Sequence, residues 1–279
     1  MNSVGFMQGR LVDQIDGKIQ AFPWKQWELE FPRGAALGLG AMEWTLDHTR
    51  LAENPFVTAD GQEQIRALMA QYDVAVPSVT CDCCMQAPFW KCAGARRGEL
   101  LTELDLVLRS AAELRVRFVV IPLVDNGGVE NDEQRELLTL HLMARAPFLR
   151  HNDLQIIFET DYDPITYAWF MEQLPEDAFN INYDMGNSAS LGFDPLEEFA
   201  AYGERIVNVH VKDRLRGGGT VALGAGAVDF DRVFAGLARQ RYSGNFILQT
   251  ARAADGAHES TLAEYLRMVT TLWRRYYEP

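Results

Sequence analysis

Residues 206–213, with the sequence IVNVHVKD, carry the densest group of side chains that could do chemistry. Apolar and β-branched residues fill the first part, as in a strand that is covered on both faces. His210, Lys212 and Asp213 then follow within four positions. An imidazole, an ammonium and a carboxylate where a strand ends can bind a metal ion or move protons. The alternative is a strand end with one satisfied histidine and a surface pair of lysine and aspartate.

Oxygen-bearing side chains end three other apolar runs, at Glu159, Asp184 and Gln249. Together with His210 they offer two carboxylates, one imidazole and one amide oxygen. This donor set suits one divalent metal ion, such as Mn²⁺, Mg²⁺, Co²⁺ or Zn²⁺, whose charge the carboxylates would cancel. In the alternative, the carboxylates bond only to loop amides and neighbouring side chains. That arrangement is costly, because carboxylates that face each other without a cation repel.

The elements that must position these residues are predicted from eight apolar, β-branched runs with helical patterns between them. Repeated strand and helix units indicate a parallel sheet, and eight of them within 279 residues predict an α/β (β/α)₈ barrel, the TIM barrel. A doubly wound open sheet is the competing fold, but no Gly-x-Gly-x-x-Gly turn follows the first run. The predicted strands are 4–7, 37–44, 74–79, 118–123, 155–159, 179–184, 206–211 and 245–248.

Amphipathic patterns predict helices over 62–71, 100–114, 132–149 and 259–277. Asp163-Pro164 and Asp194-Pro195 each offer an N-cap with proline at the first helical position, and both follow a predicted strand. No linker, repeat or charge block divides the chain. We therefore expect a single domain over residues 1–279.

Polar side chains follow nearly every predicted strand at the same end. In a (β/α)₈ barrel this end carries the active site, because the loops after the strands converge there. Lys212 is positioned to polarise a substrate oxygen, and Arg214 precedes a glycine run at 217–219 that suits a phosphate or carboxylate, or is simply a flexible loop. The candidate substrate-binding residues are Arg10, Glu43, Asn126, Asn187, Asp213, Arg214 and Arg252.

Five segments in order resemble the xylose-isomerase-like sugar phosphate isomerase/epimerase superfamily, over residues 5 to about 252. They are GFMQGRL (5–11), FET (158–160), NYDMGN (182–187), HVKD (210–213) and LGAGAVDF (223–230). The resemblance implies a TIM barrel and a metal held by Glu, Asp, His and a final Glu. It places the first three ligands on Glu159, Asp184 and His210, whereas the fourth position falls on Gln249.

The glutamine at position 249 bears on the reaction. In the sugar epimerases that the chain resembles, two metal-bound glutamates face each other across the substrate, and glutamine accepts no proton at working pH. With Glu159 as the remaining base, three reactions stay open: a single-base isomerisation through a metal-stabilised enediolate, a metal-assisted hydride shift, and a lyase or dehydratase reaction with Lys212 or Glu43 as second proton carrier. A further alternative is a sugar-binding protein that lost catalysis.

The expected partner is a small sugar or sugar phosphate, bound with Glu159, Lys212 and Gln249 as catalytic residues. A net charge of −13 argues against nucleic acid, and one well-placed histidine cannot build the zinc-rich centre of the abasic-site endonucleases in the same superfamily. No run approaches the ~18 apolar residues of a membrane span, so we expect no membrane partner and a cytoplasmic enzyme. The resemblance also allows a homo-oligomer.

The cysteines gather in one segment, at Cys81, Cys83 and Cys84, with Cys92 nearby. Their spacing lacks the paired C-x-x-C of zinc ribbons and knuckles, and four cysteines make no disulfide framework for a chain of this length. The sequence alone therefore favours buried thiols.

Overall fold

The eight predicted runs all overlap a strand in the computed structural model, which describes residues 4–253 and 255–278. All eight strands end at the same face of the molecule, because neighbouring strands run parallel. The strands are β1 (Val4–Met7), β2 (Ala41–Thr45), β3 (Ser78–Thr80), β4 (Phe118–Leu123), β5 (Gln155–Thr160), β6 (Phe179–Asp184), β7 (Ile206–Val211) and β10 (Asn245–Leu248).

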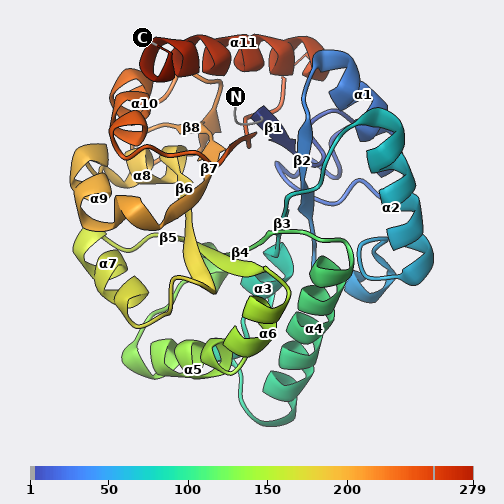
Figure 1. The fold of residues 1–279 in the computed structure, drawn as a ribbon, viewed down its shortest axis with the longest axis vertical. Helices are drawn as coiled ribbons and strands as arrows, with labels where there is room; N and C mark the ends of the chain where they lie inside the picture. The colour runs from blue at the N-terminus through green and yellow to red at the C-terminus, as the bar shows by residue number, and fades with distance from the viewer. Residues whose placement is uncertain (1–3, 254, 279) are drawn as a thin grey trace.

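These eight strands pair in parallel and close into a barrel in the order β1-β10-β7-β6-β5-β4-β3-β2. Helices surround the barrel as an outer ring (Figure 1). The register places Asp184 opposite His210 and Met7 opposite Glu43. The predicted (β/α)₈ barrel is thus confirmed. A separate antiparallel pair, β8 (Asp213–Arg214) and β9 (Thr220–Val221), lies in the loop after β7.

Three strands differ from their predicted bounds, β5 only by extending one residue further, to Thr160. The run 37–44 begins inside a helix, which ends with Gly38 in the left-handed conformation at φ 78°, and the strand starts only at Ala41. The run 74–79 contains Pro77, which has no N–H for a ladder, and β3 starts after it at Ser78.

The helices confirm the amphipathic predictions, with one division. The run 132–149 forms two helices, because Pro147 cannot donate to the carbonyl four residues before it. Asp163 and Asp194 both cap helices through their side chains, as predicted. The helices are α1 (Glu30–Leu37), α2 (Ala59–Tyr72), α3 (Asp82–Gln86), α4 (Gly94–Glu113), α5 (Asp132–Met143), α6 (Ala146–His151), α7 (Pro164–Glu172), α8 (Met185–Leu191), α9 (Pro195–Tyr202), α10 (Phe230–Arg239) and α11 (His258–Tyr277).

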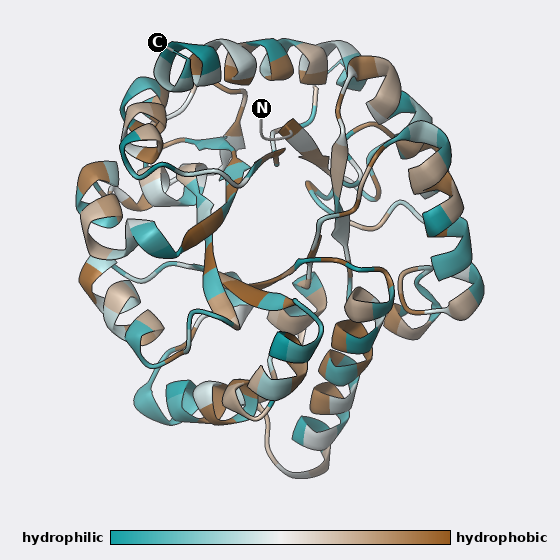
Figure 2. Ribbon diagram, in the orientation of Figure 1, coloured by the Kyte–Doolittle hydropathy of each residue, from teal (hydrophilic) through white to brown (hydrophobic). Residues whose placement is uncertain are grey.

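The core lies between the strands and the helix ring. Strand residues are predominantly apolar, whereas the helices alternate between apolar and polar positions around their circumference (Figure 2). Phe158, Phe179 and Phe246 are fully buried on the strands, and Phe170 and Phe234 meet them from α7 and α10. Among the described helices, none is long and apolar enough to cross a membrane.

Glu30, the first residue of α1, binds the backbone of the segment that follows β1, residues 8–11. Its fully buried carboxylate accepts hydrogen bonds from the backbone N–H of Gly9 at 2.7 Å and of Leu11 at 3.1 Å. Burial raises the pKa of Glu30 to about 7, although both N–H groups oppose the shift. A protonated side chain therefore stabilises the fold more than an ionised one.

We expect Glu30→Gln to remove part of the pH dependence of folding. The folded state holds this proton up to about pH 7, whereas the unfolded chain releases it near 4.5. The contribution is therefore complete below pH 4.5 and lost as the pH rises through 7, a change of about 3 kcal/mol. Urea unfolding of both proteins between pH 4 and 8 measures the difference. Parallel stability curves would contradict the assignment.

Candidate active site

A pocket of about 500 Å³ opens at the carboxyl ends of the strands. Loops and strand ends from around the barrel contribute its polar lining, which includes Gln20, Asp82, Asp125, Glu159, Asp161, Asn187, Lys212, Arg214 and Gln249. A larger hollow of about 860 Å³ lies around Arg117 and Gln155, where β5 begins, and it holds none of the predicted site residues. The chemistry predicted from the sequence therefore belongs to the first pocket.

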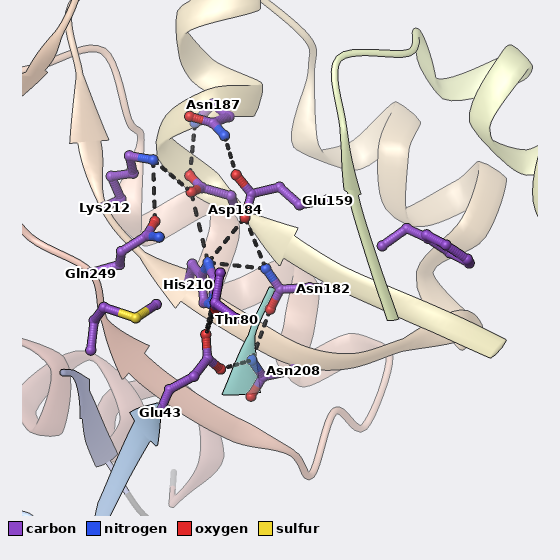
Figure 3. A network of polar contacts seen from close by, with 12 residues as sticks. Glu43, Thr80, Glu159, Asn182, Asp184, Asn187, Asn208, His210, Lys212 and Gln249 are labelled. Atoms are coloured by element: carbon purple, nitrogen blue, oxygen red, sulfur yellow. Dashed lines mark hydrogen bonds and ion pairs between the residues drawn. The ribbon is translucent and has the colours of Figure 1, made fainter. Parts of the chain in front are cut away.

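Glu159, Asp184 and His210 come together at the ends of β5, β6 and β7 (Figure 3). One ligand atom of each lies within 4.8 Å of the others, and all three residues are buried. His210 Nδ1 is 3.1 Å from Glu159 Oε2 and 4.0 Å from Asp184 Oδ2. Ligand atoms that share one cation at bonds of about 2.1 Å lie roughly 3 to 3.5 Å apart, so the three residues fit a divalent metal after small shifts.

Glu43 lies beneath the imidazole and fixes its orientation. The fully buried carboxylate receives His210 Nε2–H at 2.7 Å, and the Ser78 and Thr80 hydroxyls donate to it at 2.6 and 2.5 Å. Burial lowers the pKa of His210, but Glu43 and Glu159 outweigh it and raise that pKa to about 10. Glu43 thus holds Nε2 and leaves Nδ1 aimed at Glu159 and Asp184, the nitrogen that would give up its proton to a bound metal ion.

Two asparagines complete this buried network, and the sequence analysis gave neither of them a role in the site. Asn182 Nδ2 lies 3.2 Å from Glu159 Oε2 and 3.0 Å from His210 Nδ1, while Asn208 Nδ2 donates to Glu43 Oε2 at 3.1 Å. Asn208 also donates to Asn182 Oδ1 at 2.8 Å. A signal was available: with a period of two, these residues share a strand face with Asp184 and His210.

Lys212 lies between Asp184 and Gln249. Its Nζ donates to Asp184 Oδ2 at 3.0 Å and to Gln249 Oε1 at 3.1 Å. Gln249 Nε2 in turn donates to Gln20 Oε1 at 3.2 Å. The ammonium and the amide thus form the side of the site away from Glu159 (Figure 3).

The close approach of Lys212 depends on a glycine at position 186. A Cβ there would lie 2.9 to 3.0 Å from Lys212 side-chain and backbone carbon atoms. Any larger residue would push the lysine away from its two partners. The NYDMGN segment therefore supplies the Asp184 carboxylate and, through Gly186, the space in which the Lys212 ammonium approaches it.

Among the predicted substrate-binding residues, Asn187 and Arg214 line the pocket. Asn187 Nδ2 donates to Glu159 Oε1 at 2.5 Å, and its Oδ1 accepts from Arg214 Nη1 at 2.8 Å. Asn187 N–H also donates to Asp184 Oδ1 at 2.8 Å, where Asp184 caps α8. One asparagine thereby orients both carboxylates.

The other predicted substrate-binding residues form hydrogen bonds to loops and to His210. Arg10 and Arg252 donate to the backbone carbonyls of Thr250 and Val12, and Glu43 lies under His210. Asp213 accepts from the backbone N–H groups of Gly224, Gly226 and Val228, and Asn126 donates to Met85 and Gln86 carbonyls. None of these five lines the pocket among the described residues.

We expect Glu43→Gln to weaken divalent metal binding about 10- to 100-fold, because the carboxylate that orients and polarises His210 is lost. The affinity for Mn²⁺ is measured by isothermal titration, with Glu53→Gln as the control, because Glu53 is exposed and its carboxylate pairs with Arg50 at the surface. Equal affinities in wild type and Glu43→Gln would mean that Glu43 does not support a metal ligand.

Comparisons with known proteins agree with the barrel fold. A sequence profile described as xylose isomerase-like TIM barrel matches residues 31–270. No curated protein sequence matches the chain. The structure resembles IolI protein with a bound zinc atom, at 14% identity and a TM-score of 0.75, over 98% of this chain and 99% of that one.

Two further solved structures share the fold. D-psicose 3-epimerase in the presence of D-fructose has 12% identity and a TM-score of 0.73, over 99% of this chain and 100% of the other. A xylose isomerase-like TIM barrel protein from Mycobacterium smegmatis, in complex with magnesium, has 17% identity and a TM-score of 0.67, over 97% of each chain. With a profile match across most of its length, this chain belongs to the xylose isomerase-like TIM barrel family.

Proposed function

We propose that this protein is a divalent-metal-dependent sugar isomerase or epimerase in which Glu159 moves the proton. The observation that carries the proposal is the buried convergence of Glu159, Asp184 and His210, of which Glu159 lines the pocket. Sugar epimerases and metal-bound proteins among the structures of the same fold support it. Bound there, a divalent ion would polarise the carbonyl and hydroxyl oxygens of a sugar.

The protein's own residues set up the proton transfer. Asn187 and Asn182 donate to the two oxygens of Glu159 and hold its carboxylate plane fixed. Glu159 then removes a proton from the hydroxyl-bearing carbon next to the substrate carbonyl and returns it to the former carbonyl carbon, while the proton of that hydroxyl passes to the former carbonyl oxygen. Lys212, which already donates to two oxygens, can donate to a substrate oxygen on the opposite side.

A single-base isomerisation is favoured over a two-base epimerisation. Gln249 accepts no proton at working pH, and its oxygen is engaged by Lys212. Glu43, the other carboxylate near the imidazole, lies fully buried beneath it and out of reach of a substrate. We therefore infer the interconversion of an aldose and a ketose.

The pocket suits an unphosphorylated sugar better than a sugar phosphate. Its described lining includes the carboxylates of Asp82, Asp125, Glu159 and Asp161 against two basic groups, Lys212 and Arg214. Both basic groups already have partners: Lys212 on Asp184 and Gln249, and Arg214 on Asn187 and the Gly218 carbonyl. No basic side chain of this lining is therefore without a partner for a phosphate dianion, whereas neutral hydroxyls find amide and carboxylate partners.

The test removes bound metal from the protein with a chelator, reloads the protein with Mn²⁺, Mg²⁺, Co²⁺ or Zn²⁺, and measures the conversion of a panel of sugars. Neutral aldoses and ketoses are compared with their monophosphates, and products are analysed after reaction in D₂O. We expect metal-dependent conversion of a neutral sugar, with deuterium or internally transferred hydrogen at the carbon next to the carbonyl. Metal binding without turnover of any sugar would reject the enzymatic proposal.

A further inference from the structure

The segment between β3 and α3 brings three thiols together outside the site described above. The Sγ atoms of Cys81, Cys83 and Cys84 all lie within 4.8 Å of one another, and all three residues are buried. Three sulfur ligands on one zinc ion, at bonds of about 2.3 Å, lie roughly 3.8 Å apart. The thiols are therefore close to the spacing that one ion needs.

This convergence is a property of the local backbone. In a regular helix, residues two apart point about 200° from each other, so Cys81 and Cys83 would diverge. Cys81 instead precedes α3 with φ −85° and ψ 67°, outside the helical region, while Cys83 and Cys84 are helical. The bend at Cys81 turns the three sulfurs toward one another.

Two backbone hydrogen bonds also tie the triad to the barrel, and a third lies within it. Cys81 N–H donates to the Val120 carbonyl on β4 at 2.9 Å, and Cys83 N–H donates to the Leu46 carbonyl after β2 at 2.8 Å. Cys84 N–H donates to the Cys81 carbonyl at 3.0 Å. The barrel therefore prearranges the ligands, which lowers the entropic cost of binding an ion.

The donor set selects the kind of ion. Soft thiolates favour zinc and related thiophilic metals, and a divalent ion leaves only one net negative charge on three buried thiolates. His48 adds no ligand, because Arg96 Nη2 donates to its Nε2 at 3.0 Å and its Nδ1 lies 3.2 Å from Glu103 Oε2. Cys92, which is less buried, lies outside the group.

We infer that Cys81, Cys83 and Cys84 form a second metal site, an all-sulfur site for a divalent thiophilic ion such as Zn²⁺. It is separate from the Glu159–Asp184–His210 cluster, whose oxygen and nitrogen donors suit harder ions. A chain of hydrogen bonds also connects the segment of the three cysteines with the pocket. Asp82 lies between two of the cysteines and accepts from Gln20 at 2.7 Å, which in turn accepts from Gln249.

Cadmium is the probe that separates the two sites, because thiolate-to-cadmium charge transfer absorbs in the ultraviolet and carboxylate or imidazole ligation does not. The reduced, chelator-treated full-length protein is titrated with Cd²⁺. We expect an absorption that saturates at one equivalent, that falls by at least one third in Cys83→Ser, and that is unchanged in the matched control Cys92→Ser.

X-ray absorption of the zinc-loaded wild type keeps the inference testable if Cys83→Ser does not fold. Three sulfur neighbours at about 2.3 Å on a bound zinc would support the site. A shell of oxygen and nitrogen alone, or no thiolate absorption with Cd²⁺, would overturn it. Mass spectrometry of the peptide that contains Cys81, Cys83 and Cys84 gives a further check. A mass two hydrogens below that of the reduced peptide would assign two of the thiols to a disulfide and would also overturn the inference.

Discussion

Replacing Glu159 by glutamine is expected to lower turnover about 10²- to 10⁴-fold, the range that a positioned general base supplies. The amide keeps the size of the side chain but accepts no proton. Asn187 and Asn182 now both donate to the glutamate oxygens, so one of them would face an amide NH₂ in the variant. The loss should appear in kcat at saturating metal and sugar.

Glu133→Gln is the matched control, because Glu133 is an exposed residue on α5 and does not line the pocket. Metal content must be measured in both variants, since Glu159 is also a proposed ligand. If metal-loaded Glu159→Gln turns over sugar at the wild-type rate, the base is another residue.

His210→Ala is expected to abolish binding of one equivalent of a divalent metal. The imidazole is the single nitrogen donor of the cluster, and its Nδ1 lies close to both carboxylates. The variant also leaves Glu43 fully buried without its charged partner, which costs about 3–5 kcal/mol of folding stability. Elemental analysis and thermal unfolding measure the two effects separately.

His151→Ala, at the exposed end of α6, provides the control for a lost histidine. If His210→Ala does not fold, Asp184→Asn tests the same cluster, because the amide keeps the size of the side chain and one of the two oxygens that accept from Lys212 and from the Asn187 N–H. Wild-type metal affinity in either variant would disprove the assigned site.

Much of the fold could be predicted because its signals are local. Buried parallel strands read as apolar runs, and the polar residues at their ends mark one face of the barrel. The cluster of Glu159, Asp184 and His210 could be anticipated because β5, β6 and β7 are neighbours in a closed sheet. The predicted bounds of strands and helices were wrong where one residue ends an element. Pro77 delays the start of β3, and Pro147 divides the predicted helix 132–149.

The roles within the site depended on where side chains point. Glu43 lies within β2 and Asp213 follows β7, but one accepts from His210 inside the barrel and the other accepts from backbone N–H groups of a loop. Residue type and position cannot separate a group that touches substrate from one that positions its neighbour. The convergence of the three thiols likewise depends on one pair of dihedral angles at Cys81.

Asp213 has a consequence for how this pocket can change. Its carboxylate accepts hydrogen bonds from the backbone N–H groups of Gly224, Gly226 and Val228. These bonds hold together the two ends of the loop after β7. Closing a loop costs entropy that grows only with the logarithm of its length, about 0.6 kcal/mol per doubling. With the two ends held, residues inserted at 217–219 would enlarge the rim at little cost to the barrel. The length of this loop is therefore a variable through which evolution or design can refit the pocket to a larger substrate.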